Sequence, residues 1–141
     1  MFNRILVTMD NSETMSQSTF DKALVLAREN HARLMLLHVL PPNAVQDSDM
    51  DTLQLLHKTA KTEGLAADVA QLYGDHEHVI CDLANRWGAD LILLGQHDST
   101  QNDSAPPVWF AAQSPCSVLL AQTPNALHLK ASKVEQFAMM A

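Results

Sequence analysis

The sequence predicts an α/β fold, with an open five-stranded parallel sheet and helices on both faces. Two observations predict it. Short apolar runs alternate along the chain with segments in which apolar residues recur at helical spacing. Two of the runs, 32–40 and 90–95, are almost uninterrupted, which is typical of strands buried on both faces. The length of 141 residues suits one domain. We place this domain at 1–122 and treat 123–141 as a C-terminal tail that packs on the domain or on a dimer partner.

Each expected strand is an apolar run that ends in turn-forming residues. The first, RILVTM, ends at Asp10-Asn11-Ser12, a cluster that we expect to form a turn and cap the following helix. The run ARLMLLHVL ends at Pro41. The strands expected on this basis are 4–9, 32–40, 67–73, 90–95 and 116–121.

The expected helices lie between these runs. In 76–87 the apolar residues share one face of a helix: Val79, Ile80, Leu83, Ala84 and Trp87. Gly64 and Gly88 suit helix C-terminal caps, and Gly74 suits a turn. The expected helices are 13–30, 52–63, 76–87, a short one after Ser104, and one near 131–140 in the tail.

Composition and charge exclude several classes of protein. The formal net charge is -7, and 9 Lys and Arg face 16 acidic residues, which argues against a nucleic-acid partner. No apolar run approaches the ~18 residues of a membrane span, and the first residues do not resemble a signal peptide. We therefore expect a cytoplasmic protein without a membrane partner. Cys81 and Cys116 are too few for a disulfide framework or zinc site, and we expect both to be buried.

No motif in the sequence nominates an enzyme. There is no Walker P-loop, no G-x-G-x-x-G fingerprint and no G-x-S-x-G nucleophile elbow. His76 and His78 are one residue apart and would not face each other on a helix, so no metal site is expected. Ligands of parallel sheets bind at the carboxyl ends of strands, which directs attention to residues 8–12, 38–42 and 94–104.

Four sequence blocks resemble the universal stress protein family. They are Asp10-Asn11-Ser12 after the first strand, LLHVLPP, GADLILLGQH and SPCSVLL, and they keep the order and spacing of the family over residues 2–122. The resemblance implies a Rossmann-like sheet of the adenine nucleotide alpha hydrolase-like type, usually in a homodimer. It also implies an ATP site in those members that bind ATP.

The resemblance carries the family's nucleotide contacts to positions of this chain. An Asp after strand one contacts the nucleoside, a Val of strand two presents backbone to adenine, and a glycine loop after strand four holds the phosphates. In that loop, glycines allow backbone N–H groups to approach phosphate. The matching positions are Thr8, Asp10, Val39, Leu94, Gly95 and His97.

The chain departs from the family's phosphate loop of G-x-x-G, nine residues and G-[ST]. Asp98 stands at the second glycine, and no alignment restores the later glycine. Asp98 and Asp103 bring carboxylates to the place of the triphosphate, where like charges repel by ~1 kcal/mol in water. Pro106 and Pro107 remove N–H donors there.

Structural roles for the same residues stay open. Asp10 could cap a turn, Val39 could be core, Gly95 could end a strand, and His97 could be an exposed loop residue. The leading hypothesis is a non-catalytic stress-response protein with weak or lost ATP binding, which dimerises through the last strand at the sheet edge. The alternative is a stress protein that binds ATP, ADP or AMP at the ends of strands one, two and four. No cofactor is certain on either hypothesis.

Overall fold

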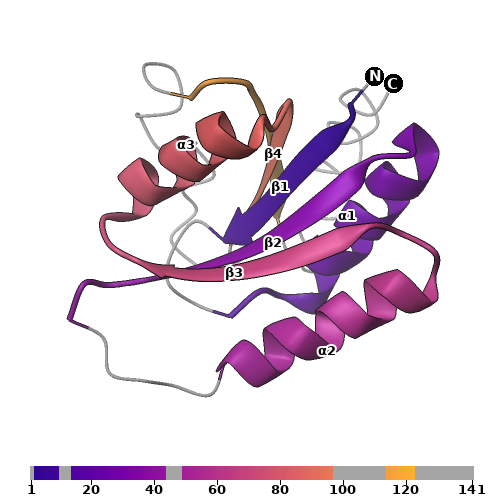
Figure 1. Ribbon diagram of the computed structural model, residues 1–141, viewed down its shortest axis with the longest axis horizontal. Helices are drawn as coiled ribbons and strands as arrows, with labels where there is room; N and C mark the ends of the chain where they lie inside the picture. Colours follow the sequence, from indigo (N-terminus) through magenta and orange to yellow (C-terminus); the bar gives the residue numbers. More distant parts are fainter. Residues whose placement is uncertain (1, 10–13, 44–48, 97–113, 123–141) are drawn as a thin grey trace, which may run out of the picture.

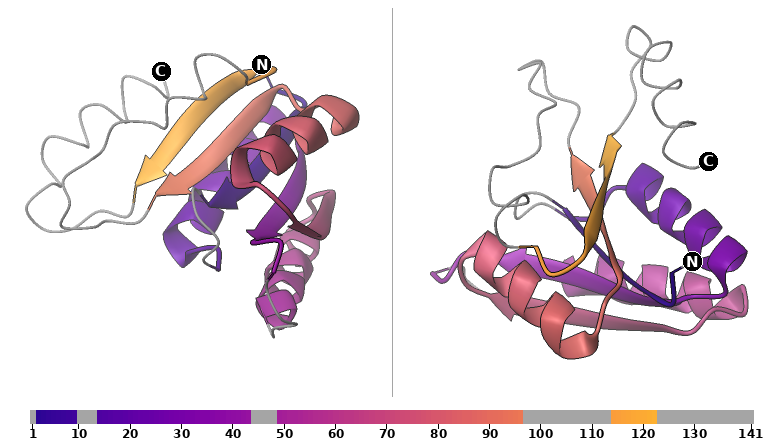
Figure 2. Two further views of the ribbon diagram at one scale, coloured as in Figure 1. Left: turned by 90° about the vertical axis from the view of Figure 1, so that its left-hand side faces the viewer. Right: turned by 90° about the horizontal axis from the view of Figure 1, so that it is seen from above.

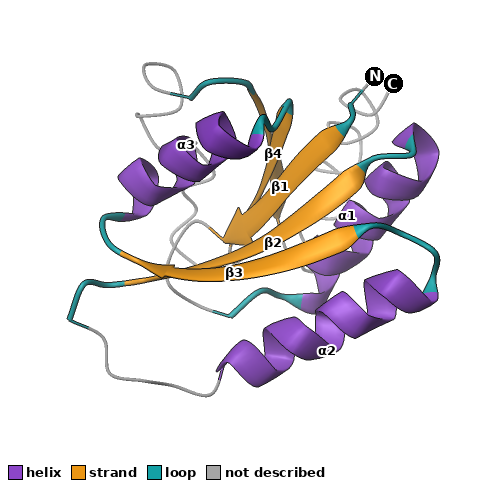
Figure 3. Ribbon diagram, viewed as in Figure 1, coloured by secondary structure: helices purple, strands orange, loops and turns teal. Residues whose placement is uncertain are grey.

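The fold is the predicted parallel sheet with helices on both faces (Figure 1). The computed structural model describes residues 2–9, 14–43, 49–96 and 114–122. All neighbouring strands are parallel, in the order β3-β2-β1-β4-β5. The elements are β1 (Arg4–Met9), α1 (Gln17–Asn30), β2 (Arg33–Leu40), α2 (Asp49–Thr62), β3 (Ala67–Tyr73), α3 (His76–Trp87), β4 (Leu91–Gln96) and β5 (Ser117–Gln122). Figure 3 separates helices, strands and loops.

Helices α1 and α2 cover one face of the sheet and α3 covers the other (Figure 2). Successive side chains of a strand point to opposite faces, so each inner strand contributes side chains to two apolar clusters, one on each face. In β1, Ile5 and Val7 pack on the side of α1 and α2, and Leu6 packs on the side of α3. All three side chains are fully buried, as the uninterrupted apolar runs predict.

The start of α1 corrects one prediction. The helix begins at Gln17, and its N-cap is Ser16 rather than the expected cluster at residues 10–12. The Ser16 hydroxyl accepts from the Thr19 backbone N–H at 3.2 Å and donates to the Thr19 hydroxyl at 2.9 Å. A cap must reach the N–H groups of the first turn, and Ser16 is the serine at that distance.

The remaining boundaries follow the predicted pattern. Helix α3 has the expected bounds, with Asp75 as N-cap and Gly88 at φ +80° as C-cap. Helix α2 begins at Asp49 rather than at residue 52, and β5 is shifted by one residue. The helix expected after Ser104 and the tail 123–141 lie outside the described residues, so these predictions and the domain division stay untested.

Contacts at the amino edge of the sheet fix β1 against α3 and β4. Arg4 donates from Nη1 to the Trp87 carbonyl at 2.6 Å, and its guanidinium lies 5.8 Å from the centroid of the Trp87 ring. The Asp90 carboxylate accepts from the backbone N–H groups of Asn3 and Arg4 at 2.8 and 3.0 Å. One end of α3 is thereby joined to the start of β1.

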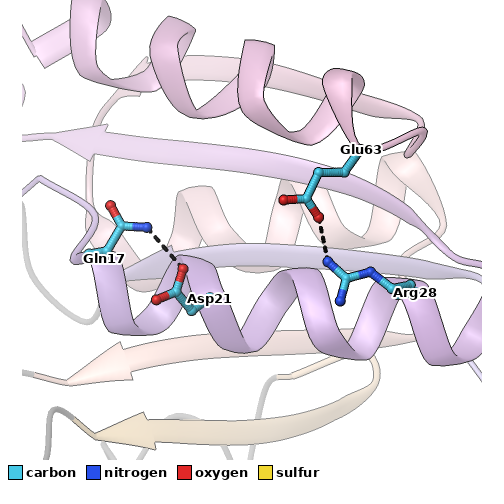
Figure 4. A network of polar contacts seen from close by, with 4 residues as sticks. All are labelled: Gln17, Asp21, Arg28 and Glu63. Atoms are coloured by element: carbon cyan, nitrogen blue, oxygen red, sulfur yellow. Dashed lines mark hydrogen bonds and ion pairs between the residues drawn. The ribbon is translucent and has the colours of Figure 1, made fainter.

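Two polar contacts of α1 side chains lie on the surface (Figure 4). Arg28 pairs with Glu63 just beyond the end of α2, and Gln17 donates to the Asp21 carboxylate at 2.9 Å. The Arg28 and Glu63 side chains are 55% and 38% exposed, so solvent screens their attraction. The two helices are therefore held on the sheet mainly by their apolar faces.

Two further expectations concern the edges and the membrane. The strand order places β5 at an edge of the sheet, as predicted, and β3 at the opposite edge. In the described part of the chain, no helix has both the length and the apolar character of a membrane span.

Candidate functional site

The strand order creates a switch point between β1 and β4. From β1 the chain proceeds to β2 and β3 on one side, and it later returns to β4 and β5 on the other side. Connections leave in opposite directions here, and open α/β sheets bind ligands at the carboxyl ends of the strands at such a point. The switch point is thus the first place to look for the predicted site residues.

The structure brings three of the predicted site residues together at this point. Thr8 is the register partner of Leu94, and Met9 is the partner of Gly95. Val39 lies one strand away, on β2, where it pairs with Leu72 of β3. Asp10 and His97 lie outside the described residues.

Among the described site residues, Thr8 has a buried polar group that the surrounding structure does not explain. Its side chain is fully buried, and its hydroxyl has no hydrogen-bond partner among the described residues. A buried hydroxyl without a partner costs about 1–3 kcal/mol and calls for a physical reason. Thr8 is therefore the residue of the switch point whose polar atom still lacks a role.

Val39 and Leu94 contribute their side chains to the core. Both are at most 1% exposed and belong to the apolar cluster under α3. Their side chains are thus part of the core and offer a ligand no polar contact. Val39 is therefore a core residue, and its backbone contact with adenine stays a prediction.

Gly95 has a packing role that its sequence position does not reveal. A Cβ at Gly95 would lie 2.6 Å from Met9 Sδ, 3.0 Å from Thr19 Cγ2, and closer still to the Thr19 hydroxyl. The missing side chain lets the first turn of α1 approach β4. This close approach accounts for a glycine at the position without any ligand.

His76 belongs to this edge, although sequence reasoning misses it. It is the first residue of α3, and its Nε2 lies 2.8 Å from the Met9 carbonyl oxygen. A carbonyl only accepts, so Nε2 carries the proton and donates. The sequence suggests only a metal ligand beside His78, and that possibility is already unfavourable. A polar side chain at a helix start near a strand end is the available signal.

The two cysteines lie on the α3 side of the sheet. Both are free and partly exposed, so the expectation of full burial is wrong. Cys81 of α3 lines a pocket of about 250 Å³ with His78, Asp82, Asn85 and Pro115. Of the predicted site residues that the structure describes, none lines this pocket. In the described residues, no three His, Cys, Asp or Glu side chains gather as metal ligands.

Burial raises the pKa of both thiols. For Cys81 the charge of Glu77 adds to the effect of burial, and for Cys116 the charges of Asp90 and Cys81 do so. Both thiols therefore resist ionisation to the thiolate, the form that reacts as a nucleophile. This environment is typical of structural cysteines.

Comparison with known proteins accounts for the architecture. The model of the universal stress protein family matches residues 1–105 of the chain. The chain belongs to the universal stress protein family. Universal stress protein YxiE of Bacillus subtilis is 29% identical over 118 residues, which cover 67% of this chain and 79% of the relative.

Solved structures of the family share the fold. The universal stress protein from Archaeoglobus fulgidus in complex with dAMP has a TM-score of 0.59 at 19% identity. The match covers 84% of this chain and 96% of that structure. A universal stress protein family protein from Arabidopsis thaliana with AMP bound has a TM-score of 0.60 at 16% identity, covering 88% and 93%.

Proposed function

We propose that this member of the universal stress protein family is a non-catalytic, cytoplasmic stress-response protein that acts as a homodimer and binds ATP weakly or not at all. The observation that carries the proposal is the packing of Gly95. Of the glycines of the family's phosphate loop, Gly95 is the one that this sequence retains. Its missing side chain accommodates Thr19 and Met9, so packing alone accounts for it.

The charges of the following segment support weak binding of a triphosphate. Asp98 and Asp103 replace neutral, glycine-rich sequence with carboxylates. Like charges at close range repel, and partial burial strengthens the repulsion. A chain without the loop glycines also lacks the backbone freedom that brings N–H groups to phosphate.

The position of β5 supports a homodimer. The strand pairs with β4 on one side and has no strand on its other side among the described residues. An unpaired edge exposes backbone N–H and C=O groups that proteins usually cover. A second copy of the chain along β5 would satisfy these groups.

Two measurements test the proposal. Isothermal titration with Mg-ATP at physiological salt is expected to give no binding, or a Kd above roughly 100 μM, which corresponds to about -5.5 kcal/mol. A Kd in the low micromolar range would contradict it. Light scattering at high micromolar concentration is expected to give the mass of a dimer, and a strict monomer would contradict the assembly.

A second candidate function is binding of an adenosine monophosphate, and the environment of Thr8 favours it. The hydroxyl lies next to Leu94 at the switch point and has no partner in the described structure. A nucleoside needs few polar contacts and no phosphate loop, and Val39 has backbone groups near the end of β2. The relatives bound to dAMP and AMP have the same fold, and each of these two ligands carries a single phosphate.

Titration of AMP and ATP against two matched variants tests this candidate. The wild-type protein is expected to bind AMP more tightly than ATP. Thr8→Val keeps the shape of the side chain without the hydroxyl and is expected to lower AMP affinity, whereas Thr8→Ser keeps the hydroxyl and the affinity. Equal AMP affinity of wild type and Thr8→Val would contradict a role for this hydroxyl.

A further inference from the structure

The turn between β3 and α3 contacts the ends of two other strands. The Gly74 backbone N–H donates to the Leu40 carbonyl at the end of β2, at 2.9 Å. Two residues later, His76 Nε2 donates to the Met9 carbonyl at the end of β1, at 2.8 Å. The turn that follows β3, residues 74–76, thus contacts the ends of the next two strands in the sheet, β2 and β1.

The geometry of this turn depends on its residues. Gly74 has φ +147°, and a Cβ there would lie 2.9 Å from Val79 Cγ2, so a side chain would be strained and crowded. Asp75 then caps α3, because its carboxylate accepts from the His78 backbone N–H. Because of this cap, the helix starts at His76, which fixes the position of the His76 side chain.

The two carbonyls adjoin the expected nucleoside contacts. Met9 directly follows Thr8, and Leu40 directly follows Val39. The side chains of Met9 and Val39 are 2% and 1% exposed, so both strand ends are packed against the core. The position of the end of β1, and of Thr8 beside Met9, is therefore coupled to the position of the His76 ring.

We propose that His76 is a positioning residue of the nucleotide site: by donating to the Met9 carbonyl, it fixes the end of β1 that carries Thr8, whose hydroxyl would contact an adenosine monophosphate. The inference rests on the second candidate function, the binding of an adenosine monophosphate. His76 touches the strand end and not the ligand. Its loss lowers affinity for the nucleoside part, so AMP and ATP are affected by the same factor.

The chain contains a matched control at the other ends of the strands, their amino ends. His57 of α2 has its Nε2 2.7 Å from the Ala67 carbonyl, at the first residue of β3. Both contacts join a partly buried histidine on a helix to a strand carbonyl. They differ in position, because Ala67 lies at the amino end of its strand and Met9 lies at the carboxyl end of its strand.

The experiment compares His76→Ala, His76→Gln and His57→Ala. Each protein is titrated with AMP by calorimetry and unfolded in urea. We expect His76→Ala to weaken AMP binding about three- to tenfold, the range of one lost hydrogen bond. The amide N–H of His76→Gln is expected to restore most of the affinity. His57→Ala is expected to unfold at lower urea yet to bind AMP like the wild type.

A ligand-free measurement separates the proposal from the proposed function. Hydrogen exchange at residues 5–9 is expected to be faster in His76→Ala than in the wild type and His57→Ala. If the wild type binds no AMP and exchange still rises, the nucleotide role is overturned and His76 remains the anchor of β1. Unchanged exchange, or unchanged AMP affinity in His76→Ala, would overturn the positioning role itself.

Discussion

Replacing Gly95 by alanine tests whether this glycine is required for packing. The new Cβ would lie 2.6 Å from Met9 Sδ and 3.0 Å from Thr19 Cγ2. The Met9 side chain is flexible but buried in the core, and Thr19 is buried, branched at Cβ and tied to Ser16, so neither can give way freely. Overpacking of this kind costs about 1–3 kcal/mol. Gly95 does not have positive φ, so alanine also recovers about 0.4–1 kcal/mol from the less flexible unfolded chain.

The net expectation is a loss of about 1–2 kcal/mol in the free energy of unfolding, and a Tm lower by roughly 3–10 °C. Urea denaturation of Gly95→Ala, Thr19→Ala and the double variant measures it. Thr19→Ala removes both Thr19 atoms that would meet the new Cβ. The double variant should therefore lose less free energy of unfolding than the sum of the two single losses. A Gly95→Ala protein as stable as the wild type, or strictly additive losses, would refute the packing role.

Three further predictions concern other residues. Thr8→Val is expected to raise the free energy of unfolding by about 1–2 kcal/mol in urea denaturation, because it removes a buried hydroxyl without a partner in the described structure; a loss of stability would contradict this. Arg28→Ala is expected to cost under about 1 kcal/mol at low salt and nothing at about 1 M salt, since the pair with Glu63 is exposed; an effect that salt leaves unchanged would contradict it. The raised pKa values of Cys81 and Cys116 predict slow alkylation at neutral pH. The folded state keeps thiol protons that the unfolded state releases, so stability should fall as pH rises past the usual thiol range, and less steeply in the Ser variants. A fall of the same slope in the Ser variants would contradict the assignment.

The sheet could be predicted because its signals are local. The strands 33–40 and 91–96 have almost entirely buried side chains on both faces, and a short, unbroken apolar run is typical of such strands. The start of α1 could not be predicted in the same way. Ser12, Ser16 and Ser18 are all chemically suitable caps, and only the packed position of the helix selects Ser16.

The candidate site was predictable in place but not in detail. The end of β1 and the end of β4 meet as the βα pattern requires, and Thr8 pairs with Leu94. The contact of Gly95 with Thr19 joins residues far apart in the sequence, and the same holds for His76 and Met9. No local pattern encodes such contacts, because they arise only when helices settle on the sheet.

The two contacts between β1 and α3 also constrain the lengths of these elements. The strand is joined to the helix at both ends, through Arg4 and Trp87 at one end and through Met9 and His76 at the other. At about 3.3 Å per residue in β1 and about 1.5 Å in α3, both spans measure roughly 17 Å. An inserted or deleted residue in either element would shift one pair out of reach. We expect homologues that keep both contacts to show no insertion or deletion in either element, while the connecting loops vary freely.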